Sequence, residues 1–78
     1  MKVQILGTGC PKCQQLMANA EDAIKQAGLD AEVEKIEKLA EIMAFGVMST
    51  PALAIDGEVK SAGKLLSVAE ITQMLEGA

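Results

Sequence analysis

The junction of an apolar segment, a glycine-containing turn and a helix constrains this chain most. Residues Val3 to Leu6 are mostly apolar, and the Gly7-Thr8-Gly9 segment that follows lets the backbone turn tightly. From Pro11 to Ala27, apolar residues recur at helical spacing, with a proline suited to the first helical position and Gly28 suited to the stop. Because a strand that leads into a helix favours a parallel crossover, we expect the next strand to lie beside the first.

The middle of the chain predicts a second strand and a second, shorter helix. Residues Asp30 to Ile36 alternate imperfectly around a central valine, which favours a strand. Leu39, Ile42 and Met43 then share one face of a short helix that ends near Gly46.

Two local patterns define the C-terminal part of the chain. Asp56-Gly57 is a strong hairpin signal, because both central residues of a type I′ turn need a positive φ, and it joins expected strands at Ala52–Ile55 and Glu58–Lys60. Ser67 with Glu70 three residues later forms a capping box that starts a last helix. The predicted order is therefore β-α-β-α-β-β-α, an α/β arrangement.

Composition excludes several classes of protein. The chain has 78 residues, half of them apolar, and a net charge of −4. It has no arginine and a single aromatic residue, whereas nucleic-acid binding needs cationic phosphate contacts and often stacking faces. No apolar run approaches the roughly 18 residues of a membrane span, and the first residues enter a strand rather than a signal peptide. We expect one cytoplasmic domain over residues 1–78, with no membrane or nucleic-acid partner.

The two cysteines of Cys10-Pro11-Lys12-Cys13 carry most of the chemistry. One helical turn brings their sulfurs within bonding distance, and a cytoplasmic disulfide is rarely a static crosslink. If Cys10 is the N-cap, its sulfur meets free N–H groups and the positive end of the helix dipole, which favours the thiolate. Pro11 removes one redundant N–H group and Lys12 adds a nearby cation. We expect Cys10 to be the nucleophile and the more shielded Cys13 to resolve the mixed disulfide.

A soft-metal or metalloid carrier is the main alternative. Two thiolates suit Cu(I), but they are too few for a closed zinc site, and the chain has no histidine. Small copper-carrier domains with Met-Thr-Cys-x-x-Cys have methionine where Thr8 stands and lack the second helix. Four methionines could suggest a soft-metal surface, but flexible core filling is the more frequent use: Met17, Met43, Met48 and Met74. A third hypothesis is a redox-sensing module whose disulfide changes partner affinity without turnover.

Three segments together match a known pattern. They are Gly-Thr-Gly-Cys-Pro-Lys-Cys after the first strand, Ser49-Thr50-Pro51 before the third, and Gly63 after the fourth. Over essentially its whole length the chain resembles the small thioredoxin-like or glutaredoxin-like redox-active disulfide proteins of archaea and bacteria. The resemblance implies a minimal thioredoxin fold, with a four-stranded mixed sheet flanked by helices. It also implies that Pro51 is a cis-proline facing the disulfide, that the Thr50 backbone pairs with substrate, and that Gly63 lines the substrate groove.

The chain also departs from that pattern. Gly9 stands where typical thioredoxins carry a tryptophan, and the first strand has only Lys2 and Gln4 as polar side chains. The buried carboxylate that helps thioredoxins to deprotonate the resolving cysteine therefore has no evident counterpart. Without arginine, the chain also lacks a clamp for the carboxylates of glutathione. We expect a monomeric thiol-disulfide oxidoreductase without a cofactor or metal, which acts on protein disulfides and is recycled by a reductase.

Overall fold

The computed structural model describes residues 1–77, and its elements follow the predicted order. They are β1 (Lys2–Leu6), α1 (Pro11–Ala27), β2 (Glu32–Ile36), α2 (Leu39–Ala44), β3 (Ala52–Ile55), β4 (Glu58–Ala62) and α3 (Val68–Glu76). The second strand begins two residues later than the predicted Asp30, because its pairing partner β1 begins at Lys2, opposite Glu32. The fourth strand continues beyond Lys60, because Ala62 still pairs with Ala52.

The four strands form one mixed sheet in the order β2-β1-β3-β4. β1 is parallel to β2 and antiparallel to β3, and β3 is antiparallel to β4. At the end of β1, Leu6 pairs with Ile36 on one side and with Ala52 on the other. The loop that leaves β1 therefore emerges between the end of β2 and the start of β3. This arrangement confirms the predicted minimal thioredoxin fold.

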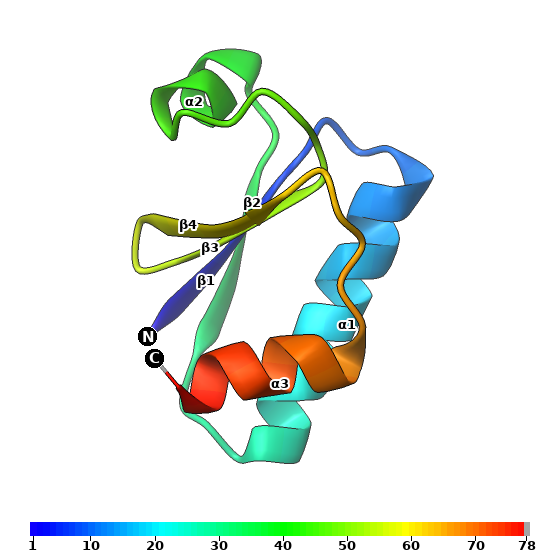
Figure 1. Cartoon of the computed structure of the whole chain (residues 1–78), viewed down its shortest axis with the longest axis vertical. Coiled ribbons are helices and arrows are strands. Elements are labelled where there is room, and N and C mark those ends of the chain that lie inside the picture. The colour runs from blue at the N-terminus through cyan, green and yellow to red at the C-terminus, as the bar shows by residue number, and fades with distance from the viewer. Residues whose placement is uncertain (78) are drawn as a thin grey trace.

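Helices α1 and α3 cover one face of the sheet, while α2 lies at the end of the molecule where β1 leads into α1 (Figure 1). Alternate strand residues divide between the faces, as the two-residue period of a strand requires. The buried side chains under α1 and α3 are Val3, Ile5, Leu16, Ala20, Ala23, Leu53, Ile55, Leu66, Ile71 and Leu75. A smaller cluster near α2 contains Leu6, Ile36, Ile42, Val47, Ala52 and Ala54.

Local signals in the sequence fix several boundaries as predicted. α1 has Pro11 at its first position and ends at Gly28, which adopts a left-handed conformation with φ of 65°. The hairpin turn has positive φ at Asp56 and Gly57, 52° and 87°. At the start of α3 the Ser67 hydroxyl accepts from the Glu70 N–H while the Glu70 carboxylate accepts from the Ser67 N–H, so the predicted capping box is confirmed.

Helix α2 leaves Met43 exposed, although we expected this methionine to fill the core. Ile42 is buried, but Leu39 and Met43 are 64% and 65% exposed, and nearby Met48 is fully exposed. Because the helix has only six residues, Ile42 is its one buried residue, and this side chain packs in the smaller cluster near α2. Interpreting Met43 and Met48 as core filler was therefore wrong, whereas Met17 and Met74 do pack against the main core. None of the helices among residues 1–77 is long and apolar enough to cross a membrane.

Candidate active site at the start of helix α1

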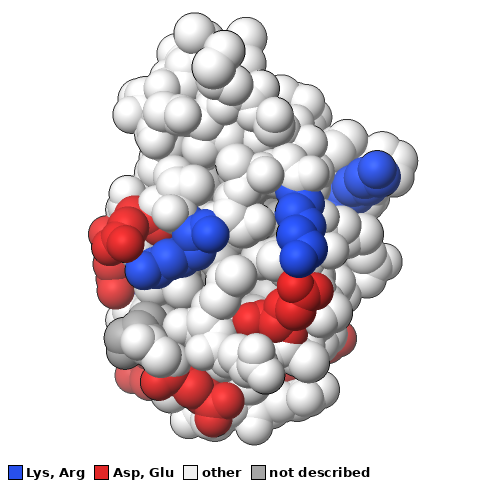
Figure 2. Space-filling model, viewed as in Figure 1, with Lys and Arg blue, Asp and Glu red and all other residues white. Residues whose placement is uncertain are grey.

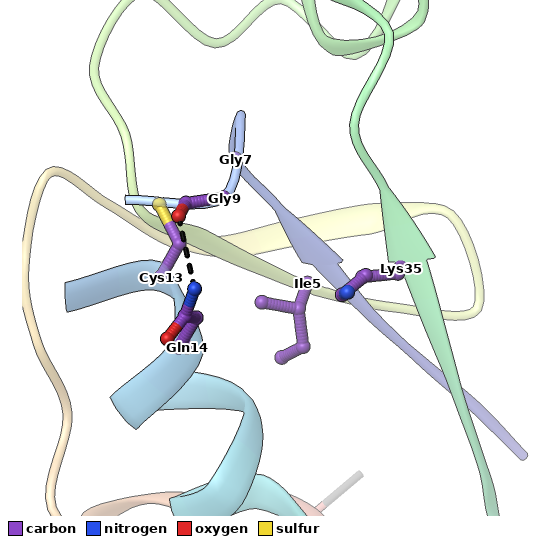
Figure 3. Close-up of a pocket in the computed structure, with 6 residues that line it drawn as sticks. All are labelled: Ile5, Gly7, Gly9, Cys13, Gln14 and Lys35. Carbon is purple, nitrogen blue, oxygen red and sulfur yellow. Dashed lines mark hydrogen bonds between the residues drawn. The ribbon is translucent and has the colours of Figure 1, made fainter. Parts of the chain in front are cut away.

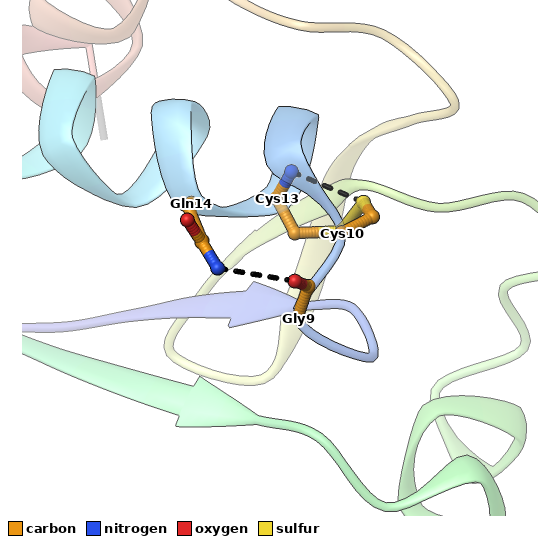
Figure 4. Close-up of a disulfide and its surroundings, with 4 residues drawn as sticks. All are labelled: Gly9, Cys10, Cys13 and Gln14. Carbon is orange, nitrogen blue, oxygen red and sulfur yellow. Dashed lines mark hydrogen bonds between the residues drawn. A yellow bond between two sulfur atoms is a disulfide. The ribbon is translucent and has the colours of Figure 1, made fainter.

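Cys10 and Cys13 are joined by a disulfide at the first turn of α1, with their Cα atoms 5.0 Å apart (Figure 4). Cys10 is the N-cap, with extended backbone angles, and its sulfur accepts a hydrogen bond from the Cys13 N–H at 3.2 Å. The predicted capping geometry is therefore confirmed. A Cys10 thiolate in this position would meet the same N–H group and the positive end of the helix dipole, which both favour negative charge.

The two sulfur-bearing residues differ in how far solvent reaches them. Cys10 is half-buried, while Cys13 is only 5% exposed. Pro11 and Lys12, between them, are both exposed and form the outer surface of the first helical turn. A disulfide in another molecule can therefore approach Cys10 far more readily than Cys13.

The Gly9 loop before the cysteines is fixed to the helix by a side chain that sequence analysis did not single out. The Gln14 Nε2 atom donates to the Gly9 carbonyl oxygen at 3.2 Å (Figure 4). Gly9 has φ of 89°, a conformation that favours glycine. The only sequence signal for this contact is an amide side chain in the first turn of the helix, which is too common to identify it.

A second loop, which carries Thr50 and Pro51, ends where β3 begins. The Thr50–Pro51 peptide bond is cis, as the resemblance implied. Pro51 is buried and Thr50 is exposed. The N–H of Gly63, which has φ of 75°, donates to the Pro51 carbonyl oxygen at 2.9 Å. The structure thus brings Gly63 against the proline loop, although the two residues are far apart in the sequence.

An apolar groove connects the loop before Cys10 with the loop before Pro51. It has a volume of about 380 Å³ and is lined by Thr8, Leu39, Ile42, Met43, Val47, Met48 and Thr50. None of these residues is charged. On the face shown in Figure 2, charged side chains gather away from the end of the molecule that holds α2. The groove was not predictable from the sequence, because it depends on α2 leaving its outer residues uncovered.

The inner side of Cys13 packs against the backbone of Gly7. Both residues line a small cavity of about 10 Å³, together with Ile5, Gly9, Gln14 and Lys35 (Figure 3). Among residues 1–77, no charged side chain is buried, and no group of three or more cysteine and carboxylate side chains is arranged to hold a metal ion.

A disulfide at the N-terminus of the first helix, together with a cis-proline loop that shares a groove with the segment before Cys10, defines a redox protein of the thioredoxin fold. A family model described as a thioredoxin domain matches residues 1–76, and the chain belongs to that family. The chain is 48% identical to a thioredoxin of Methanothermobacter thermautotrophicus over 75 residues, which cover 96% of this chain and 97% of the relative. It is 40% identical to a thioredoxin of Methanocaldococcus jannaschii over 74 residues, which cover 95% and 85%.

A solved structure supports the fold independently. A chain described as the structure of a malarial protein superimposes with a TM-score of 0.71 at 14% identity, covering 97% of this chain and 93% of that one. At this identity the likeness concerns the fold alone. Together with the thioredoxin relatives, the paired cysteines identify a thiol-disulfide oxidoreductase with a redox-active disulfide.

Proposed function

We propose that the protein reduces disulfides in other proteins, with Cys10 as the attacking thiolate and Cys13 as the resolving thiol. The observation that carries this assignment is the difference between the two sulfurs. Cys10 is accessible and caps the helix, whereas Cys13 is 5% exposed. An accessible, stabilised thiolate suits the first attack, and a shielded neighbour suits the second.

The thiol-disulfide exchange proceeds in two nucleophilic substitutions at sulfur. The Cys10 thiolate attacks one sulfur of the substrate disulfide, and the other substrate sulfur leaves as a thiolate that takes up a proton. Cys13 then loses its proton and attacks the Cys10 sulfur, which releases the second substrate thiolate and leaves the Cys10–Cys13 disulfide. Two electrons and two protons from a recycling reductase restore the dithiol. Pro11 and Lys12 support the first step by shaping the exposed surface beside Cys10.

The substrate surface in this proposal consists of the proline loop and the apolar groove. The exposed Thr50 backbone pairs with an extended substrate segment, while Pro51 and Gly63 hold the loop in position. Met43 and Met48 offer flexible, polarisable contacts, which suit a surface that accepts varied apolar side chains. We infer that substrates place an apolar residue near their reactive cysteine.

Trapping of mixed disulfides tests the assignment of the two cysteines. Cys13→Ser should accumulate substrate adducts linked through Cys10, because the resolving thiol is missing. Cys10→Ser is the matched control and should form no adducts. Intact mass spectrometry identifies the linked residue. If Cys13→Ser forms no adduct and the wild-type chain reduces no protein disulfide, the proposed function is wrong.

Substrate size tests the role of the groove. Met43→Ser should lower kcat/KM for a protein disulfide with flanking apolar residues, but leave the rate with a small aromatic disulfide reagent unchanged. Met43→Leu keeps an apolar side chain of similar size and serves as the control. Equal losses with both substrates would argue against the groove as a substrate surface.

Several other expectations stay predictions. Wild-type protein that retains stoichiometric Cu(I) through desalting, with loss of the metal in Cys10→Ser, would support the soft-metal carrier. Residues 1–78 as one domain, the monomeric state and the cytoplasmic location are likewise proposals. Size-exclusion chromatography with light scattering tests the monomeric state.

A further inference from the structure

Gly7 is not required for an unusual backbone conformation. Positive φ values occur at Gly9, Gly28, Gly46, Gly57 and Gly63, but not at Gly7. The Gly7 N–H donates to the Ile36 carbonyl oxygen at 2.9 Å, which continues the pairing of β1 with β2. The backbone of Gly7 is therefore fixed in place. The atoms around Gly7, rather than its backbone angles, explain why a residue without a side chain occupies this position.

Cys13, the proposed resolving cysteine, lies directly against Gly7. A Cβ atom built on Gly7 would overlap the Cys13 Sγ atom and lie 2.9 Å from the Cys13 Cβ atom. Both distances are too short for ordinary contacts, so something would have to move. Neither side can retreat easily, because β2 holds the Gly7 backbone and the first turn of α1 holds the Cys13 backbone.

The two redox states differ in how they can respond to such a contact. In the disulfide, the Cys13 Sγ atom is held by bonds to its own Cβ atom and to the Cys10 sulfur. In the dithiol, the sulfur can rotate about the Cα–Cβ bond, and the small cavity lined by Gly7, Gly9 and Cys13 lies beside it. The contact with Cys13 Cβ costs both states equally, whereas the overlap with Sγ costs mainly the disulfide.

We propose that Gly7 is a positioning residue that sets the reduction potential of the Cys10–Cys13 pair, by leaving the space that Cys13 Sγ occupies in the disulfide. This inference rests on the proposed function of the same pair. A side chain at position 7 raises the free energy of the disulfide relative to the dithiol, so the disulfide becomes easier to reduce. The entropy that alanine removes from the unfolded chain is the same in both redox states and cancels.

A redox titration of wild type, Gly7→Ala and Gly28→Ala in defined dithiol buffers tests the proposal. Gly7→Ala should shift the exchange equilibrium toward the dithiol by about tenfold or more, which corresponds to a potential about 30 mV more positive. Gly28→Ala is the control: it strains a left-handed residue with no atom within 4 Å of the added Cβ, so it should lower stability and leave the potential unchanged. An unchanged potential in Gly7→Ala overturns the inference.

Urea unfolding of the oxidised and reduced forms gives a second measurement. Gly7→Ala should lower the unfolding midpoint of the oxidised form more than that of the reduced form, whereas a purely structural role would lower both equally. If Gly7→Ala does not fold, the same change is made in the Cys13→Ala background, which has no sulfur to overlap. Recovery of folding there supports the Sγ contact. Continued failure assigns the loss of folding to the contact with Cβ of residue 13, which both redox states share, and so overturns the inference. If the wild type shows no reversible disulfide transition, both the proposed function and this inference are wrong. If the wild type shows a normal transition and Gly7→Ala has the same potential, only the inference about Gly7 is wrong.

Discussion

Gly63 connects the end of β4 to the loop that carries the cis-proline, and its replacement by alanine should lower both stability and activity. Gly63 has φ of 75°, and an added Cβ atom would lie 3.0 Å from the Ser49 Cβ atom. A side chain in this left-handed region costs roughly 1–2 kcal/mol. For a domain of this size, each 1 kcal/mol lowers Tm by about 4–8 °C.

The contact with Ser49 adds a local displacement to that cost. At 3.0 Å the neighbour has to give way by a few tenths of an ångström, and Ser49 is exposed, so it can move. Because Thr50 and Pro51 follow directly, the displacement passes into the substrate loop. A misplacement of 1 Å can cost on the order of 100-fold in rate, so a few tenths should lower kcat/KM by roughly threefold to tenfold.

Gly46→Ala provides the matched comparison. Gly46 has φ of 81°, but an added Cβ atom would meet no atom within 4 Å. Thermal unfolding should show similar losses of Tm for the two variants, while steady-state reduction of a protein disulfide should fall only in Gly63→Ala. If the two variants have the same kcat/KM, the connection between Gly63, Ser49 and the proline loop is refuted.

Three further predictions concern stability. Ser67→Ala removes the hydroxyl that accepts from the Glu70 N–H and should cost about 1 kcal/mol in urea unfolding. Hydrogen bonds from the Lys64 ammonium, and then from Ser67, hold the pKa of Glu70 below its ordinary value of 4.5. These hydrogen bonds therefore stabilise the folded state above pH 4.5, and their contribution is lost as the pH falls through the lower folded-state pKa of Glu70. The midpoints of urea unfolding should decline on acidification, and they should decline less in Glu70→Gln. Leu16→Ala empties a fully buried site and should cost about 2–5 kcal/mol by circular dichroism melts, and a loss under 1 kcal/mol would contradict the packing described for α1.

Structural features that depend only on residues close together in the sequence could be predicted. The Asp56-Gly57 turn, the Ser67 capping box and the start of α1 at Pro11 all depend on backbone angles or hydrogen bonds among near neighbours. Cys10 as N-cap belongs to the same kind, because its sulfur meets an N–H group only three residues away. These signals give the order of the elements and the position of the redox pair.

Features that depend on packing between distant elements were not predictable in the same way. The tight contact of Gly7 with Cys13 requires β1 and the first turn of α1 to meet at one particular spacing, which no periodicity encodes. The sequence suggested only a flexible turn at Gly7, but that freedom is used at Gly9. Likewise, the exposure of Met43 and Met48 follows from the shortness of α2 and the absence of a covering element among residues 1–77.

The central position of β1 affects the order in which the molecule can be completed during synthesis. β1 is made first, yet its neighbours arrive later: Glu32 pairs with Lys2, and Ile55 pairs with Val3. Because a chain emerges from the ribosome N-terminal end first, Cys10 and Cys13 meet solvent before either neighbouring strand has emerged. Until β3 has emerged, the redox state of these cysteines is therefore set by the surroundings rather than by the fold.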